Sequence, residues 1–280
     1  MTHSRIKNLF APFFPTEDGK PSAAVAYALP LADWAKAHLT IRALAIHHNT
    51  PYSFASSIAA SFVMPDNEHQ SKLAEQAIET LRNELKSSGR AHDMAVSQQT
   101  CSALTELVGF QGRLHDLTVI DNAPEFLQPG RALVEELLFH TGRPIIVVPA
   151  DGASFSAKRI VIAWDGSAHA ARALNDALPF LAQADYVEIA CVVDEKDLSR
   201  LVPGAEVAPQ LARHGVAVTI SDLKAIDGDA GKALRARARD VTADLLVMGA
   251  YVHSRWRQLV FGGVTNSMLH HTEIPILMSH

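Results

Sequence analysis

The sequence KRIVIAWDGS, residues 158–167, decides the fold of the second half of the chain. It joins a run of branched apolar residues to a turn that contains Asp165 and Gly166, and an Ala- and Leu-rich stretch with amphipathic spacing follows at 168–182. Branched apolar residues favour a buried strand, and amphipathic spacing favours a helix that packs on it. The segment therefore predicts a strand, a turn and a helix, the repeating unit of a parallel sheet.

The same alternation continues through the rest of the second half. Runs rich in Val and Ile and bounded by turn signals predict strands at 159–163, 186–193, 216–221, 245–248 and 276–279. Stretches with helical spacing lie between them at 168–182, 205–214, 229–241 and 263–271. Strands that are apolar on both faces and alternate with helices indicate a doubly wound α/β domain, in which helices cover both faces of a parallel, Rossmann-like sheet.

The first half repeats this order, so the chain is predicted to be a tandem of two similar domains. The sequence KNLFAP at residues 7–12 corresponds to KRIVIA at 158–163, and ALP at 28–30 recurs at 177–179. Strands are expected near 8–12, 39–46, 92–97, 117–120 and 145–149. The small, polar segment around Asp151 reads as a linker, which gives domains 1–152 and 153–280. The long stretch at 47–68 is the main departure, and it either covers a pocket or is mobile.

Composition and charge narrow the classes of partner. The net charge of −5 and the dispersed 25 Lys and Arg residues argue against a nucleic-acid partner, which requires a concentrated basic face. No apolar stretch approaches the roughly 20 residues that span a bilayer, so no membrane association is expected. Cys101 and Cys191 fall in different halves and are expected to be reduced thiols. With an N-terminus that lacks the pattern of a signal peptide, these features predict a cytoplasmic location.

Two strand-to-helix turns of the second half are the candidate site. Ligands of open parallel sheets bind outside the carboxyl ends of the strands. Ala163–Ser167 follows the first strand there, and Gly249–Thr265 follows the fourth. A carboxylate at Asp165 could accept hydrogen bonds from a ribose or a base, and glycines that open a helix let backbone N–H groups approach a phosphate. The alternative is structural: a capped turn at Asp165 and a packing turn at Gly262.

The second half, residues 157–280, resembles the universal stress protein family. Nucleotide-binding members carry Gly-x2-Gly-x9-Gly-Ser/Thr after the fourth strand and an Asp after the first. Gly249 and Gly262 match the first and third glycines, and Asp165 matches the Asp. The resemblance implies an ATP pocket in the C-terminal domain, with Asp165 near the base or ribose and the glycine loop around the phosphates. The residues that it implicates are Ala163, Asp165, Val193, Gly249, His253, Gly262, Gly263, Val264 and Thr265.

Two positions in the second half depart from the family pattern. Val252 stands where the second glycine would be, and Gly263 replaces the hydroxyl residue. A left-handed conformation at Val252 would cost about 1–2 kcal/mol, and loss of the hydroxyl would remove about 0.5–1.5 kcal/mol. We therefore expect ATP affinity to be reduced.

The first half departs further. Phe14 stands at the place of Asp165, and Asp121 and Pro124 replace the first two glycines. An aspartate repels phosphate and a proline has no N–H to donate, so we expect no ATP binding of the family kind in this half.

Three functions follow as hypotheses. The first is a stress-response binding or signalling module with ATP in the C-terminal domain only; the resemblance implies at most slow ATP hydrolysis, and no catalytic residue is predicted.

The second is a nucleotide-free interaction protein. Relatives pair through their C-terminal edge strand, so the resemblance implies an intramolecular pseudo-dimer through 145–149 and 274–279, and further homodimerisation of the chain. The third, an ATP-using enzyme, would require a second carboxylate or a catalytic Cys beside the pocket. Cys191 ends the second strand, but the sequence places no activating base beside it. The 14 histidines are expected to be isolated residues rather than metal ligands.

Overall fold

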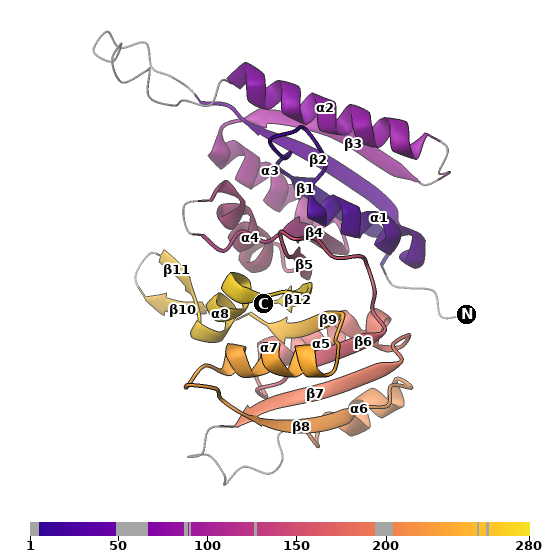
Figure 1. Ribbon diagram of the computed structural model, residues 1–280, viewed down its shortest axis with the longest axis vertical. Helices are drawn as coiled ribbons and strands as arrows, with labels where there is room; N and C mark the ends of the chain where they lie inside the picture. Colours follow the sequence, from indigo (N-terminus) through magenta and orange to yellow (C-terminus); the bar gives the residue numbers. More distant parts are fainter. Residues whose placement is uncertain are drawn as a thin grey trace.

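The computed structural model describes residues 6–48, 67–86, 89, 91–125, 128–193, 204–250, 252–255 and 258–280, and at 193, 252–255 and 258–261 only the backbone is described. The predicted stretch at 47–68 therefore lies mainly outside the described residues. Figure 1 shows an α/β molecule in which ten of the described strands form one long sheet with helices on both faces, and two more, near the C-terminus, form a separate pair. No helix within these ranges has both the length and the apolar character needed to cross a bilayer.

In the described part of the first half, five strands alternate with four helices, in the order that the sequence predicts. Its elements are β1 (Asn8–Phe13), α1 (Ala23–Ala35), β2 (His38–Ile46), α2 (Asn67–Leu85), β3 (His92–Gln99), α3 (Cys101–Leu114), β4 (Leu117–Asp121), α4 (Pro129–His140) and β5 (Ile145–Val148). The five strands lie in the spatial order β3-β2-β1-β4-β5, and each pair of neighbours is parallel. The chain order reverses between β1 and β4, which is where such sheets bind ligands.

The second half has the same topology with one addition. Its elements are β6 (Arg159–Ala163), α5 (Ala168–Leu181), β7 (Tyr186–Val193), α6 (Ala208–Arg213), β8 (Thr219–Lys224), α7 (Ala230–Asp240), β9 (Leu245–Gly249), β10 (Val252–Arg255), β11 (Gln258–Phe261), α8 (Gly263–His271) and β12 (Ile276–Ser279). The order β8-β7-β6-β9-β12 repeats the first half, again with parallel neighbours. The addition is an antiparallel hairpin of β10 and β11, which the sequence analysis did not predict.

One strand begins later than predicted. The apolar run at 216–221 reads as a strand from its first residue, but β8 begins at Thr219. The backbone N–H of Val216 donates to the carbonyl of Leu211 (3.0 Å), and Gly215 between them has φ +77°. This is the hydrogen bond of a helix C-terminal cap, and the buried Val216 supplies the apolar contact that accompanies such caps. Val216 therefore belongs to the C-terminal cap that follows α6, and not to the strand.

The two half-sheets join edge to edge into one ten-stranded sheet. β5 and β12 are antiparallel neighbours, with Ile276 opposite Val147 and Leu277 opposite Ile146. The pairing predicted for the two C-terminal strands is confirmed, and Figure 1 shows both strands at the centre of the molecule. The connection between the halves runs from the end of β5 to Arg159, and the boundary placed at 152 falls inside it.

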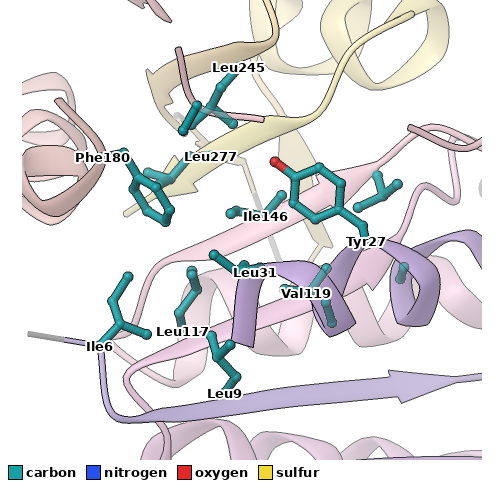
Figure 2. Packing of buried hydrophobic residues seen from close by; sticks show 14 of the residues in the cluster. Ile6, Leu9, Tyr27, Leu31, Leu117, Val119, Ile146, Phe180, Leu245 and Leu277 are labelled. Atoms are coloured by element: carbon teal, nitrogen blue, oxygen red, sulfur yellow. The ribbon is translucent and has the colours of Figure 1, made fainter. Parts of the chain in front are cut away.

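Each face of the sheet carries one apolar core that crosses the junction between the halves. Alternate strand residues point to opposite faces, so Ile146 and Leu277 contribute to one core while Val147 and Ile276 contribute to the other. Helices α1, α2, α5 and α6 cover the first face, and α3, α4, α7 and α8 cover the second. Figure 2 shows residues of both halves packed together, with Leu31 and Ile146 near Leu277. The halves therefore do not have separate cores.

An aromatic cluster fastens the connecting segment over this junction. The Trp34 ring on α1 stacks on the Phe180 ring of α5, with 5.2 Å between centroids. Phe155 of the connection packs against Trp34 (5.5 Å), Phe180 (6.4 Å) and the edge of Tyr27 (5.4 Å). Aromatic pairs of this kind add about 0.5–1.5 kcal/mol each beyond their buried area. Trp34 is thus an anchor between the halves.

Candidate functional site

A cavity of about 370 Å³ opens at the carboxyl edge of the second half-sheet, where the chain order reverses. Its walls come from the ends of β6, β7 and β9 and from the first turns of α5, α7 and α8. The described residues that line it are Ala163, Trp164, Asp165, Ala170, Ala190, Val192, Ala230, Leu234, Met248, Gly249, Gly262, Gly263, Val264 and Thr265. The structure thus brings together seven of the nine residues that the sequence analysis selected.

The other two selected residues lie where only the backbone is described. Val193 ends β7, opposite Lys224 of β8. His253 belongs to β10 and pairs with Val260. Their side chains lie outside the described residues, so their part in the site stays a prediction.

The turn after β6 combines the structural and the functional interpretation of Asp165. Its Oδ1 accepts a hydrogen bond from the Ser167 N–H (2.9 Å), and Gly166 between them has φ +76°. The Ser167 hydroxyl then accepts from the Ala170 N–H (3.1 Å) and caps α5. Asp165 is nevertheless exposed and lines the cavity. The capped turn holds the carboxylate at the mouth of the site.

Gly249 allows β9 and α5 to pack closely against each other. A Cβ at this position would lie 2.5 Å from both the Ala170 nitrogen and the His169 carbonyl carbon. Only glycine lets the first turn of α5 approach the end of β9 this closely. Its match to the family pattern therefore has a physical reason that does not depend on a ligand.

The first turn of α8 forms the opposite wall. Gly262 is its N-cap residue and provides no side-chain cap, and its carbonyl accepts the Asn266 N–H (2.9 Å). The N–H groups of a first helical turn have no partner within the helix, and the helix dipole places partial positive charge there. Gly263 adds no bulk, and a Cβ on it would meet no atom within 4 Å. This turn is suited to hold an anion by its backbone.

Val252 is compatible with the loop, because the left-handed conformation on which the cost depends is not required there. It lies in β10 opposite Phe261, in extended backbone where branched residues are favoured. The left-handed conformation that would have strained it does not occur. The loop between β9 and α8 therefore differs in shape from a plain glycine loop, because a hairpin is built into it.

The apolar walls were missed by the sequence analysis. Ala190 and Val192 come from β7, Ala230 and Leu234 from α7, and Met248 from β9. In the sequence these residues have the spacing of ordinary core positions, so no motif distinguishes them. They line a ligand-sized space only because α7 and β7 meet at this edge.

Hydrogen bonds fix α7 against α8 beside the cavity. The Asp229 carboxylate caps α7 through the Lys232 N–H (3.1 Å) and accepts from the Ser267 hydroxyl of α8 (2.7 Å). Arg235 donates to the Ser267 carbonyl (2.9 Å). Burial raises the pKa of Asp229, but the hydrogen bonds from Ser267 and the Lys232 N–H outweigh it and the pKa is lowered. Asp229 and Arg235 of the α7 region thus hold α7 and α8, which form two walls of the cavity, in a fixed relative position.

The described lining of the cavity carries little charge. Asp165 is the one charged residue among the described lining residues, and they include no Lys or Arg. Burial raises the pKa of the Cys191 thiol to about 11, with added effects of Asp222 and Asp165, so the thiol stays protonated near neutrality. Within the described ranges, no three His, Cys, Asp or Glu side chains are grouped so as to hold a metal ion.

Comparisons with known proteins agree with this architecture. Residues 156–280 match the model of the universal stress protein family. A universal stress protein of Synechocystis sp. is 28% identical over 148 residues, which cover 52% of this chain and 50% of that protein. The chain thus matches about half the length of this curated relative.

Two solved structures are similar over almost the whole chain. A universal stress protein from Archaeoglobus fulgidus has a TM-score of 0.68 at 14% identity, covering 98% of each chain. A protein of unknown function from Pseudomonas aeruginosa has a TM-score of 0.63 at 14% identity, covering 99% of this chain and 93% of that one. At this identity the similarity establishes the fold, an α/β tandem with one mixed ten-stranded sheet.

Proposed function

We propose that the C-terminal domain is a binding module for an adenine nucleotide, because residues 156–280 match the universal stress protein family model and the whole chain has the fold of a solved universal stress protein. The chain would act as a signalling component of a stress response, with the nucleotide as its signal or structural ligand. The observation that carries the proposal is the cavity at the carboxyl edge of the second half-sheet, lined by Asp165 and by Gly262–Thr265. Its volume lies within the range of small-ligand sites.

The parts of the nucleotide match different walls of this cavity. Val192, Leu234 and Met248 offer an apolar surface for the adenine ring. The exposed Asp165 carboxylate can accept hydrogen bonds from the ribose hydroxyl groups. The first turn of α8 can donate backbone hydrogen bonds to a phosphate. Since the described lining includes no cationic side chain, we expect the nucleoside part to supply most of the affinity.

Calorimetric titration of the full chain tests this proposal. ATP, ADP and adenosine should each bind saturably and with similar affinities, because the phosphates gain little from the described residues. Asp165→Ala should weaken all three by about tenfold or more, the factor that 1.4 kcal/mol gives. Asp165→Asn can keep the turn bond to Ser167 but carries no charge, so it separates the turn from the carboxylate.

Asp185→Ala is the matched control, because Asp185 is exposed and lies before β7, at the opposite edge of the sheet. It should leave the affinities unchanged. Absence of heat at millimolar ATP from folded protein would overturn the proposal. The absence of cations from the described lining favours one alternative in that event: a nucleotide-free interaction protein.

A further inference from the structure

The first half contains a larger cavity, of about 640 Å³, at the equivalent edge of its sheet. It lies at the carboxyl ends of β1, β2 and β4 and beside the first turn of α4. Apolar side chains form most of its wall, among them Phe13, Phe14, Ile46, Ile120 and Leu133. Phe14 occupies the place that Asp165 has in the second half, so no carboxylate stands at that position. The exposed residues of the lining include Thr16, His48 and Gln128.

Asp121 provides a carboxylate at the floor of this cavity. It stands at the end of β4, where Gly249 stands at the end of β9. Its Oδ1 accepts the Ala24 N–H (2.8 Å), so the carboxylate caps α1 as Ser167 caps α5. Burial raises the pKa of Asp121, while the Ser22 hydroxyl and the Ala24 N–H act against this rise. The carboxylate thus has a structural role through one oxygen and still lines the cavity.

Asn122, the next residue, links the wall of the cavity to the second half. Its Nδ2 donates to the Leu269 carbonyl of α8 (2.6 Å). Its Oδ1 is buried and accepts no hydrogen bond from any described residue. Asp121 is therefore the acceptor that the cavity offers to a ligand in this part of its wall.

The lining is unsuited to an anion. Its described residues include no Lys or Arg, Asp121 would repel a phosphate, and Pro129 has no N–H to donate at the start of α4. A nucleotide would therefore be less favourable here than in the second half. A carboxylate inside a largely apolar space instead fits a molecule that brings a hydrogen-bond donor and positive charge.

We propose that the cavity of the first half binds a small apolar organic cation, a primary or secondary amine, whose ammonium group donates a hydrogen bond to the Asp121 carboxylate. Its apolar body lies against Phe13, Ile120 and Leu133, and the carboxylate balances its charge. This inference is independent of nucleotide binding in the second half, because the two cavities share no lining residue.

Three probes of equal shape test it on the full chain by calorimetric titration: 2-phenylethylamine, 2-phenylethanol and phenylacetate. The amine should bind saturably, the alcohol at least about tenfold more weakly, and the carboxylate not at all. Equal binding of all three probes, or binding of none, would overturn the inference.

Two matched substitutions locate the amine. Asp121→Asn removes the charge but keeps an oxygen for the Ala24 N–H, and it should reduce amine affinity by about tenfold or more. Asp165→Asn makes the same change in the other cavity and should leave amine affinity unaltered. If Asp165→Asn weakens the amine and Asp121→Asn does not, the inference is wrong. If Asp121→Asn fails to fold, the three probes are compared on the Asp165→Asn chain, where selective amine binding that persists supports the inference and its loss overturns it.

Discussion

At the scale of single residues, Glu188 shows how the fold accepts a buried charge. Its side chain is fully buried, and its carboxylate accepts hydrogen bonds from Arg237 through Nε (2.7 Å) and Nη2 (3.1 Å). The Tyr186 hydroxyl donates to the same carboxylate. Burial raises the pKa of Glu188, but the hydrogen bonds from Arg237, Tyr186 and Ser221 outweigh it and the pKa is lowered. The charged form is therefore the form that the fold stabilises.

Loss of Arg237 should destabilise the protein strongly. Arg237→Ala leaves a buried carboxylate without its main donor, and we expect the free energy of unfolding to fall by about 3 kcal/mol in urea titrations at pH 7. Because the folded pKa of Glu188 lies below its usual 4.5, its contribution is complete above that pH and is lost as the pH falls through the folded pKa. The variant should therefore lose less stability on acidification than the unsubstituted chain. Parallel pH profiles of the two would contradict this account.

Gly249 and Gly263 should respond differently to the same change. Gly249→Ala places a Cβ 2.5 Å from backbone atoms of α5, so it should lower the free energy of unfolding by about 1–3 kcal/mol. Gly263→Ala meets open space and should change it by no more than about 0.5 kcal/mol. Urea titration measures both. Similar losses would show that the close approach of α5 to β9 is not what requires the first glycine.

These residues also show how far the sequence could predict the site. Asp165 and the glycines were found because turns after parallel strands leave short-range signals. The apolar walls from β7 and α7, and the partners of Glu188, were not found. They depend on contacts between residues about 50 positions apart, such as Glu188 with Arg237, and no local pattern encodes such a contact.

At the scale of elements, strands and helices could be predicted where an apolar run serves only one element and turn residues mark its ends. The ends of β6, β7 and β12 and of α8 fall where the apolar runs and turns place them. β8 starts later because Val216 completes the cap of α6, so an apolar residue served a helix end and not a strand. The β10–β11 hairpin was missed because its segment was interpreted as a phosphate-binding loop. That interpretation considered which groups could contact a ligand, and it did not consider whether the backbone could pair as two strands.

The β5–β12 pair makes a strong prediction about stability. Leu277 is fully buried at the junction, and Leu277→Ala should cost about 2–5 kcal/mol through lost burial and a residual cavity. Leu114→Ala is the matched control at the end of α3, where the side chain is 60% exposed. It should cost no more than about 0.5 kcal/mol. Thermal and urea unfolding compare the two, and equal costs would mean that the junction is not a packed core.

At the scale of the whole molecule, the repeat predicts two copies of one topology, and the structure has them. The sequence could not reveal that the copies share their cores, because this follows from the register of β5 against β12. Nor could it reveal that α8 touches both cavities: its first turn lines the nucleotide candidate site, and the Leu269 carbonyl near its end holds Asn122 of the other. Both facts depend on how the copies are placed, not on either copy alone.

The antiparallel β5–β12 junction also bears on how such a chain can diverge. When two identical chains pair through an edge strand, every substitution appears in both partners, and the pair dissolves on dilution. Covalent linkage makes the pairing intramolecular, with an effective concentration in the millimolar range for short connections. The partners are then always unlike and always present one to one. One copy can keep a glycine at the end of its fourth strand while the other acquires an aspartate, and neither change is imposed on its neighbour.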